Sequence, residues 1–450
     1  MENNKKNRKA SLVLADQIVE TVYDSKQEQT QFAIYKDNGV QYAESIKTTK
    51  GDFFPLNPHN DLVNKKVVLL PSDANEYGTT EQLLGDIQSF IRKYLDISPQ
   101  FEQIGTYYVL SSWLYDRFNE LPYLRCIGDL GSGKSRFLQT IGCICYRPII
   151  TSGATTVSPI FRILDEMGGT LILDEADFKS SEMSDDIIKI LNCGYQRGIS
   201  VLRAEGKGVY EVKAYNVFSP KIIATRETFN DKALESRCLT EEMGRTVLRK
   251  DIPIRLTDKF YEEAQELRNK LLMWRFRNYR KELIFDDTPI AGINPRLQQI
   301  ITMLMTLMES EKSKQMLREF AQKYNAELIA ERGMSRESNI IYAILELEKN
   351  TFEKTLTVGE IADCVNRDVD EIDKISARKV GWYLRKKLQL KPYKMRNGFV
   401  LNLESSKDRL DYWKDRFAIT DTDLQSEHVN DVNVPVGDMP TELTAKDVGF

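Results

Sequence analysis

The segment "YLRCIGDLGSGKSRFLQTIG", residues 123–142, decides the core of the fold. It opens with a short apolar run and closes with the apolar spacing of a helix. Between them, "GDLGSGKS" at 128–135 matches GxxxxGK[ST] at every fixed position. In a strand–loop–helix context, the amides of such a loop and of the helix N-terminus bind phosphate groups. The segment therefore predicts a phosphate loop after a strand of a parallel α/β sheet.

Each residue type in this loop has an expected role. Lys134 would reach the β- and γ-phosphates of ATP, and the Ser135 hydroxyl would coordinate Mg²⁺. A glycine-rich turn without a ligand is the alternative, and the complete match in its required context disfavours it. The predicted nucleotide-binding residues are Gly128, Asp129, Leu130, Gly131, Ser132, Gly133, Lys134, Ser135 and Arg136.

A second apolar run, "GTLILDEADF" at 169–178, ends in two carboxylates. A buried strand would bring Asp174 and Glu175 to the edge of the sheet that holds the phosphate loop. Asp174 would support the Mg²⁺ shell, and Glu175 would polarise the attacking water. The letters "DEAD" also suggest a superfamily-two helicase, but the other RNA-binding motifs of that class are missing.

Two further segments carry candidate catalytic residues. The strand "PKIIATR" ends in Thr225, which could orient the water or simply cap the next turn; Arg226 is a weaker candidate. In "DKALESRCL", Arg237 ends a short helix. A guanidinium stays ionised and donates in a planar fork, which suits the charge on a transferred phosphoryl group, although an ordinary solvated arginine is the alternative.

Bulk composition narrows the class of protein. A length of 450 residues suggests two to four domains. No apolar run could span a bilayer and no signal peptide is visible, so a cytoplasmic protein without a membrane partner is expected. The six cysteines form no CxxC pair and the two histidines lie away from every motif. Disulfides, zinc sites and histidine-based catalysis are therefore disfavoured.

Periodicity divides the chain into five parts. A hairpin is expected in "QFAIYKDNGVQYAESI", with its turn at Asn38-Gly39, and a helix opens at the capping box Thr79–Gln82. The expected parts are a small α+β N-terminal domain (1–77), helices and the ATPase core (78–257), a helical lid (258–334), a winged helix (335–403) and an acidic, largely disordered tail (404–450).

Two basic elements could contact DNA. The ribbon "SVLRAEGKGVYEV", 200–212, places Lys207 at a glycine-flanked tip and Arg203 on one strand. A solvated surface hairpin is the alternative. The segment 378–396 carries eight basic residues and no acidic one, on an expected helix and wing. There Lys379, Arg385, Lys386, Lys394 and Arg396 are candidate DNA contacts, Trp382 is expected in the core, and a protein-docking domain is the alternative.

The order "GDLGSGKS", "LILDEADF", "GYQRGISVLRAEG", "KIIATR", "ALESRC" resembles the AAA+ module of the minichromosome maintenance (MCM) helicases over residues 121–300. The whole chain looks most like the shorter MCM-like replication proteins of bacterial mobile elements. The resemblance implies a hexamer, a hairpin lysine in the ring channel, Arg237 as a trans-acting finger, and Arg296 as a second sensor. Thr225 departs from the usual asparagine, the helix-two insertion does not fit, and the zinc-binding cysteines are absent.

The resemblance implies an ATP-driven, ring-forming DNA helicase that takes one strand through its channel and binds duplex by the winged helix. A primase or polymerase of the same element is a possible partner. Two alternatives stay open: a helicase loader or remodelling ATPase, and a nucleotide-switched origin-binding protein. Substitution of Lys207 separates them, because only a translocase needs the hairpin.

Overall fold

A computed structural model provides the coordinates. It describes residues 7–151, 155–174, 182–206, 211–229, 231–244, 248–333, 336–351, 353–367, 369, 374–396, 398–417 and 419–420, with the backbone alone at 182–185 and 329–333. Contacts divide the chain into two compact units, 1–322 and 323–450.

Within the described residues, the first unit is built on a sheet of five parallel strands. The three central strands are short, largely buried and mostly apolar runs, each followed by a helix or loop, as the alternating pattern predicted. The strand order is β14-β8-β13-β10-β9. Their bounds are β8 (Tyr123–Ile127), β9 (Pro148–Thr151), β10 (Thr170–Leu173), β13 (Lys221–Thr225) and β14 (Cys238–Glu242).

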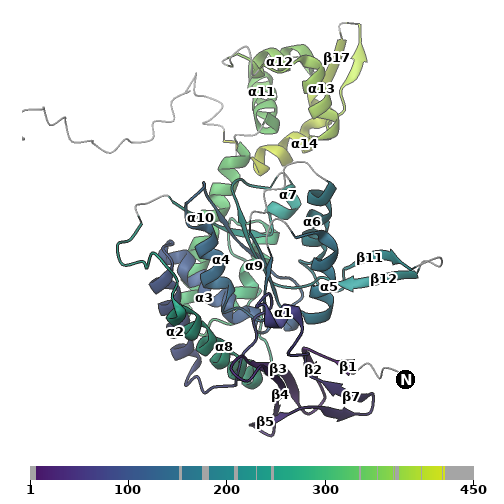
Figure 1. Cartoon of the computed structure of the whole chain (residues 1–450). Coiled ribbons are helices and arrows are strands. Elements are labelled where there is room, and N and C mark those ends of the chain that lie inside the picture. The colour runs from purple at the N-terminus through teal and green to yellow at the C-terminus, as the bar shows by residue number, and fades with distance from the viewer. Residues whose placement is uncertain are drawn as a thin grey trace, which may run out of the picture. The chain divides into compact units, whose positions relative to one another are not determined.

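Helices cover both faces of this sheet (Figure 1). Helix α4 (Lys134–Gly142) packs on β10 so closely that a Cβ at Gly142 would lie 2.4 Å from Cδ1 of Ile172. Helix α5 (Val157–Met167) and helix α6 (Glu182–Cys193) contact each other on the other side. The close contact at Gly142 fixes α4, and with it the loop at its N-terminus, against the sheet.

The N-terminal region is almost entirely β-structure. Its larger sheet has the order β2-β3-β4-β5, and its smaller one β1-β7-β6. The predicted hairpin joins β4 to β5, but the positive φ angles fall at Asp37 (50°) and Asn38 (60°), so the turn lies one residue earlier than expected. The bounds are β1 (Asn7–Arg8), β2 (Ser11–Val13), β3 (Ile18–Asp24), β4 (Gln29–Lys36), β5 (Gly39–Ala43), β6 (Ile46–Thr48), β7 (Gly51–Phe54) and helix α1 (Asp61–Asn64).

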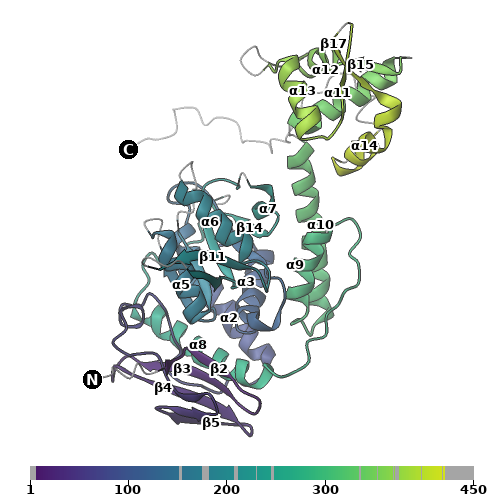
Figure 2. The same cartoon turned by 90° about the vertical axis from the view of Figure 1, so that its right-hand side faces the viewer.

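Three helices join this region to the core: α2 (Thr80–Tyr94), α3 (Pro99–Ser112) and α8 (Asp258–Asn278). The capping box of α2 is confirmed, because the Thr79 side chain and Gln82 bond each other's backbone. Helix α8 packs on α2 and lies between the N-terminal sheet and the core (Figure 2). The sequence analysis assigned α8 to the helical lid (258–334), and the apolar face of this helix is buried against neighbouring elements of the first unit. Helix α9 (Pro295–Met305) and helix α10 (Glu311–Gly333) follow it.

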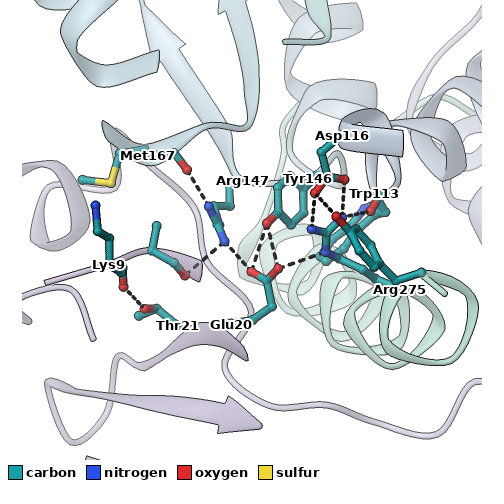
Figure 3. A network of polar contacts seen from close by, with 11 residues as sticks. Lys9, Glu20, Thr21, Trp113, Asp116, Tyr146, Arg147, Met167 and Arg275 are labelled. Carbon is teal, nitrogen blue, oxygen red and sulfur yellow. Dashed lines mark hydrogen bonds and ion pairs between the residues drawn. The ribbon is translucent and has the colours of Figure 1, made fainter. Parts of the chain in front are cut away.

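A buried ionic network links the N-terminal sheet to the core (Figure 3). Glu20 of β3, 2% exposed, accepts from Tyr146 Oη (2.8 Å), Arg275 Nε (2.9 Å) and the Arg147 guanidinium. Arg275 of α8 also pairs with both oxygens of Asp116, at 2.9 and 2.8 Å. These partners are far apart in sequence, so the N-terminal region folds onto the core instead of standing as a tethered domain.

The second unit has its own apolar core, formed by the helices, the wing strands and the final helix. Its elements are α11 (Arg336–Asn350), β15 (Thr355–Thr357), α12 (Val358–Val365), α13 (Ala377–Lys386), β16 (Tyr393–Met395), β17 (Gly398–Asn402) and α14 (Leu403–Arg416).

Helix α14 corrects the expected tail. Residues 404–416 are helical, and Leu410 and Phe417 are buried in the core of the second unit. The high charge of this helix concealed an apolar stripe, because its polar residues occupy the exposed face. The part of the tail beyond Thr420 lies outside the described residues. No helix in the described part of the chain is both long and apolar enough to cross a membrane.

Candidate active site

The phosphate loop joins β8 to α4, as the sequence predicted. Gly131 and Gly133 have φ angles of 82° and 98°, which a residue with a Cβ rarely adopts. A Cβ at Gly128 would lie 2.5 Å from Ser132 Oγ and 3.0 Å from the Met243 carbonyl oxygen. The loop therefore needs glycine for backbone torsion at two positions and for space at a third.

Lys134 lies over its own loop. Its Nζ donates to the carbonyl oxygens of Gly128 at 2.6 Å and Asp129 at 2.8 Å. This places the ammonium above the amides at the start of α4, where a polyphosphate would bind. A bound nucleotide would replace carbonyl acceptors by charged phosphate oxygens, which are stronger partners.

Ser135 and Asp174 are 39 positions apart in the sequence, and their side chains are in contact. Ser135 Oγ donates to Asp174 Oδ2 at 3.1 Å, with Asp174 directly after β10. A hydroxyl and a carboxylate at this distance, beside a phosphate loop, fit the oxygen donors that Mg²⁺ prefers. These two oxygen donors could hold the ion, which would supply charge to balance bound phosphates. Glu175, the predicted water-polarising residue, lies outside the described residues.

Two buried hydroxyl groups lie near the loop without a hydrogen-bond partner among the described residues. They are Oγ of Ser132 and Oγ1 of Thr225, the last residue of β13. The Gly128 amide donates to the Thr225 carbonyl oxygen at 3.3 Å, so this strand end touches the loop. Buried hydroxyls without partners are costly and concentrate at functional sites. Thr225 therefore lies at a strand end beside the loop, and its sensor role stays a prediction.

The side chains of two predicted loop residues, Arg136 and Leu130, point away from the loop or into solvent. The Arg136 guanidinium donates to the carbonyl oxygens of Pro253 and Ile254, both at 2.9 Å, and of Tyr94 at 3.3 Å. This side chain anchors a neighbouring segment, and the predicted contact of Arg136 with nucleotide stays a prediction. The Leu130 side chain is 86% exposed, and only its backbone belongs to the loop.

The predicted arginines gather at the other edge of the sheet. Arg237 directly precedes β14, and its carbonyl oxygen accepts from the Tyr123 amide at the start of β8 (2.8 Å). Arg296, at the start of α9, donates to Ser236 Oγ at 2.8 Å. Burial, with Arg296 as the second cause, lowers the pKa of Arg237 below its ordinary value. Two guanidinium groups that repel each other in a half-buried setting favour an added anion.

This edge is opposite the phosphate loop. Strand β8 separates the two, and its length is roughly 13 Å at about 3.3 Å per residue. Arg237 also bonds to Asn192 and lies over the ring of Tyr195, 5.0 Å from its centroid, which fixes its direction. Neither Arg237 nor Arg296 is brought to the Lys134 side of the same subunit. Arg237 lies just after helix α7 (Lys232–Glu235), whereas Arg296 lies in the first turn of α9.

The predicted ribbon is present as strands β11 (Ser200–Glu205) and β12 (Glu211–Asn216), which extend beyond α5 (Figure 1). Arg203 donates to Asp186 at 3.1 Å and lies 5.3 Å from the ring centroid of Phe161. The ribbon therefore uses Arg203 to pack against the core, and the role of Arg203 as a DNA contact stays a prediction. Lys207 lies outside the described residues.

Lys221, which the sequence analysis did not select, anchors both ends of this ribbon. It is fully buried, and Nζ donates to the carbonyl oxygens of Gly194 and Val217, both at 3.1 Å, and of Ser219 at 2.9 Å. A Cβ at Gly194 would lie 2.4 Å from Nζ. Burial lowers the pKa of Lys221 to about 7. The sequence signal that could have identified Lys221 is a lysine at the first position of an otherwise apolar strand.

The second unit presents its basic residues to solvent. The five predicted contacts on α13 and the wing are all exposed: Lys379, Arg385, Lys386, Lys394 and Arg396. Leu384 is buried, but Trp382 is 40% exposed, with Lys379 Nζ 4.8 Å from its ring centroid. Trp382 was therefore placed wrongly in the core. No cluster of metal-binding side chains occurs elsewhere in the described residues.

Comparison with known proteins gives structural neighbours only. No family model and no curated protein matches the chain. The solved structure of SCCmec type IV Cch, titled an active helicase, is 12% identical over 89% of this chain and 97% of that one, with a TM-score of 0.40. A full-length MCM homolog from Methanopyrus kandleri is 8% identical over 69% and 74%, with a TM-score of 0.37.

A third neighbour is the apo C-terminal region of NrS-1, which is 10% identical over 85% of this chain and 95% of that one, with a TM-score of 0.36. Structures similar to this chain thus include an MCM homolog and a helicase, in line with the resemblance seen in the motifs. Values this low add no argument about activity. The case for function depends on the chain's own residues.

Proposed function

We propose that the chain is an ATP-dependent DNA helicase that works as a ring, which would be a hexamer by resemblance to the MCM proteins. One observation carries the proposal. The phosphate loop with Ser135 and Asp174 lies at one edge of the sheet, and Arg237 with Arg296 lies at the other. Each subunit would supply half of an ATP site to each neighbour.

The mechanism follows from these positions. Lys134 and the loop amides would hold the phosphates of ATP, while Ser135 and Asp174 would hold Mg²⁺. Thr225 would orient the attacking water with Glu175 as its base. Arg237 of the next subunit would stabilise charge on the transferred group. Closure of each interface would then move the hairpins and the DNA strand held by Lys207.

The exposed basic residues of α13 and the wing support a second DNA contact. They would bind duplex phosphates, and Trp382 beside Lys379 would reach the bases. Such a domain could bring the ring to an origin, where a primase or polymerase of the same element would act.

The direct test is unwinding of a forked duplex with one labelled strand, with 3′ and 5′ tails examined separately. We expect ATP-dependent strand separation by the full chain and none by Lys134→Ala. Lys207→Ala should keep ATP hydrolysis and lose unwinding. Hydrolysis without unwinding in the unmodified chain would instead support the remodelling ATPase, and DNA binding with very slow hydrolysis the nucleotide-switched origin binder.

A further inference from the structure

A cleft of about 460 Å³ in the first unit has an unusual lining. Three arginines from separate parts of the chain surround it: Arg117 after α3, Arg197 before β11, and Arg280 after α8. The other lining residues are Asp116 and Tyr279. The cleft belongs neither to the phosphate loop nor to the Arg237 edge.

Backbone oxygens hold each of the three arginines. Arg117 donates twice to the Lys281 carbonyl oxygen, at 3.3 Å each. Arg280 donates to the Leu14 carbonyl oxygen at 2.6 Å, and Arg197 to that of Asp116. A guanidinium has five N–H donors, so each arginine keeps several for another partner.

The carboxylate in the cleft does not neutralise these arginines. Both oxygens of Asp116 accept from Arg275, and Oδ2 also accepts from Tyr279 Oη at 3.0 Å (Figure 3). Burial disfavours the charged form of Asp116, but Arg275 outweighs burial and keeps its pKa below the ordinary value. Among the described residues, no carboxylate forms an ion pair with Arg117, Arg197 or Arg280.

Asp16 attracts Arg280, but it is already paired with Lys36 at 2.8 Å. The three arginines therefore outnumber the carboxylates available to balance them, and a bound anion would relieve their mutual repulsion. Planar guanidinium groups match phosphate oxygens in particular. The lining contains a single aromatic ring and no aliphatic wall, whereas pockets that enclose a base are mostly apolar. The chemistry therefore favours a phosphodiester backbone over a free nucleotide.

The cleft lies at the foot of the ribbon. Arg197 precedes β11 by three positions, and it lies 5.7 Å from the ring centroid of Phe218, just beyond β12. Building on the proposed function, we propose that Arg117, Arg197 and Arg280 bind the phosphate backbone of the DNA strand that the ribbon engages. This contact reads no base and holds the strand at the root of the moving element.

The test compares salt dependence of binding. The double variant R197Q/R280Q keeps an amide donor for each carbonyl and removes two charges. The matched control, R277Q/R318Q, removes two arginines that pair with Glu76 and Asp286. Binding of fluorescein-labelled oligothymidylate is followed by anisotropy from about 50 to 200 mM salt. The cleft variant should lose about 1.4 from the slope of log K against log salt concentration, since each single-strand phosphate contact contributes about 0.7.

An unchanged slope in the cleft variant, with an unaltered melting temperature, overturns the proposal. So does calorimetry in which inorganic phosphate or ATP binds the wild-type cleft while the DNA slope stays the same, because the cleft would then hold a small anion. If R197Q/R280Q misfolds, R117Q provides the same measurement with an expected loss of about 0.7. A reduced slope in a chain that does not unwind DNA would reject the helicase function and retain this site.

Discussion

The two edges of the central sheet differ in chemistry and in completeness. The edge after β8, β10 and β13 has glycines, hydroxyl groups, Lys134 and one described carboxylate, arranged around a loop for phosphate. The edge before β8 and β14 has the half-buried Arg237 and Arg296. Within the described residues, neither edge holds both sets of groups. The proposed function requires both sets at one site, which two adjacent copies of the chain would provide.

The largest effect is expected at the phosphate edge. Lys134→Ala removes the cation above the loop, so ATP binding should weaken and hydrolysis should fall below detection, by at least about 10³-fold. Binding of a fluorescent ATP analogue and phosphate release measure the two effects. Lys232→Ala, an exposed lysine of α7, is the control and should behave as wild type.

Arg237→Ala tests the other edge. Nucleotide binding should persist because the loop is intact, while hydrolysis falls by about 10³-fold. Mixing this variant one to one with Lys134→Ala then provides the sharper test. About a quarter of the interfaces in a mixed ring would pair an intact loop with an intact arginine, so activity should return on mixing. Mixtures as inactive as their components would mean that the edges do not meet between subunits.

Substitution of Thr225 should have a smaller effect, which lowers activity and raises stability. Thr225→Val removes a buried hydroxyl without a partner among the described residues, so the free energy of unfolding should rise by about 1 kcal/mol. Hydrolysis should fall by about tenfold to a hundredfold because the water loses its orienting group. Thermal melting and turnover are measured on the same sample. A variant that is less stable yet fully active would contradict the sensor role.

The smallest effect concerns Lys221, at the opposite end of the strand that ends in Thr225. The pKa of Lys221 is about 7 in the folded chain and about 10.5 when unfolded. The unfolded state therefore binds more protons between these values, and wild type should gain stability as the pH rises through this window. Lys221→Met should lack that rise, whereas exposed Lys213→Met should keep it. Denaturant unfolding at pH 7 and pH 9 decides between them.

The residues at the phosphate edge could be predicted from the sequence because they belong to short, local motifs. The eight residues of the loop and the apolar runs before Asp174 and Thr225 are local signals, and the sheet brought their ends together as expected. The sequence did not allow interactions between residues far apart in the chain to be predicted. Nothing local indicated that Glu20 would meet Arg275, that Arg136 would bond Pro253, or that Arg203 would turn toward Asp186.

Errors of a second kind came from judging burial by the type of residue and not by its position on the helix. Helix α14 was assigned to a tail because its sequence is polar, although Leu410 and Phe417 are enough to dock it. Trp382 was assigned to the core because it is aromatic, although the period of α13 places Val380 and Leu384 inward instead. In both cases the helical face, rather than the overall composition, decided burial.

Glu20 has a consequence for how this molecule can be divided. A chain shortened to begin after the N-terminal sheet would leave Arg147 and Arg275 sealed in the interior with one carboxylate fewer between them. Desolvated cations in that position would destabilise the remaining core by several kcal/mol. Through Glu20, the amino-terminal strands thus supply the counterion of these arginines. A chain without these strands is expected to lose solubility, which would obscure any effect of the deletion on mechanism.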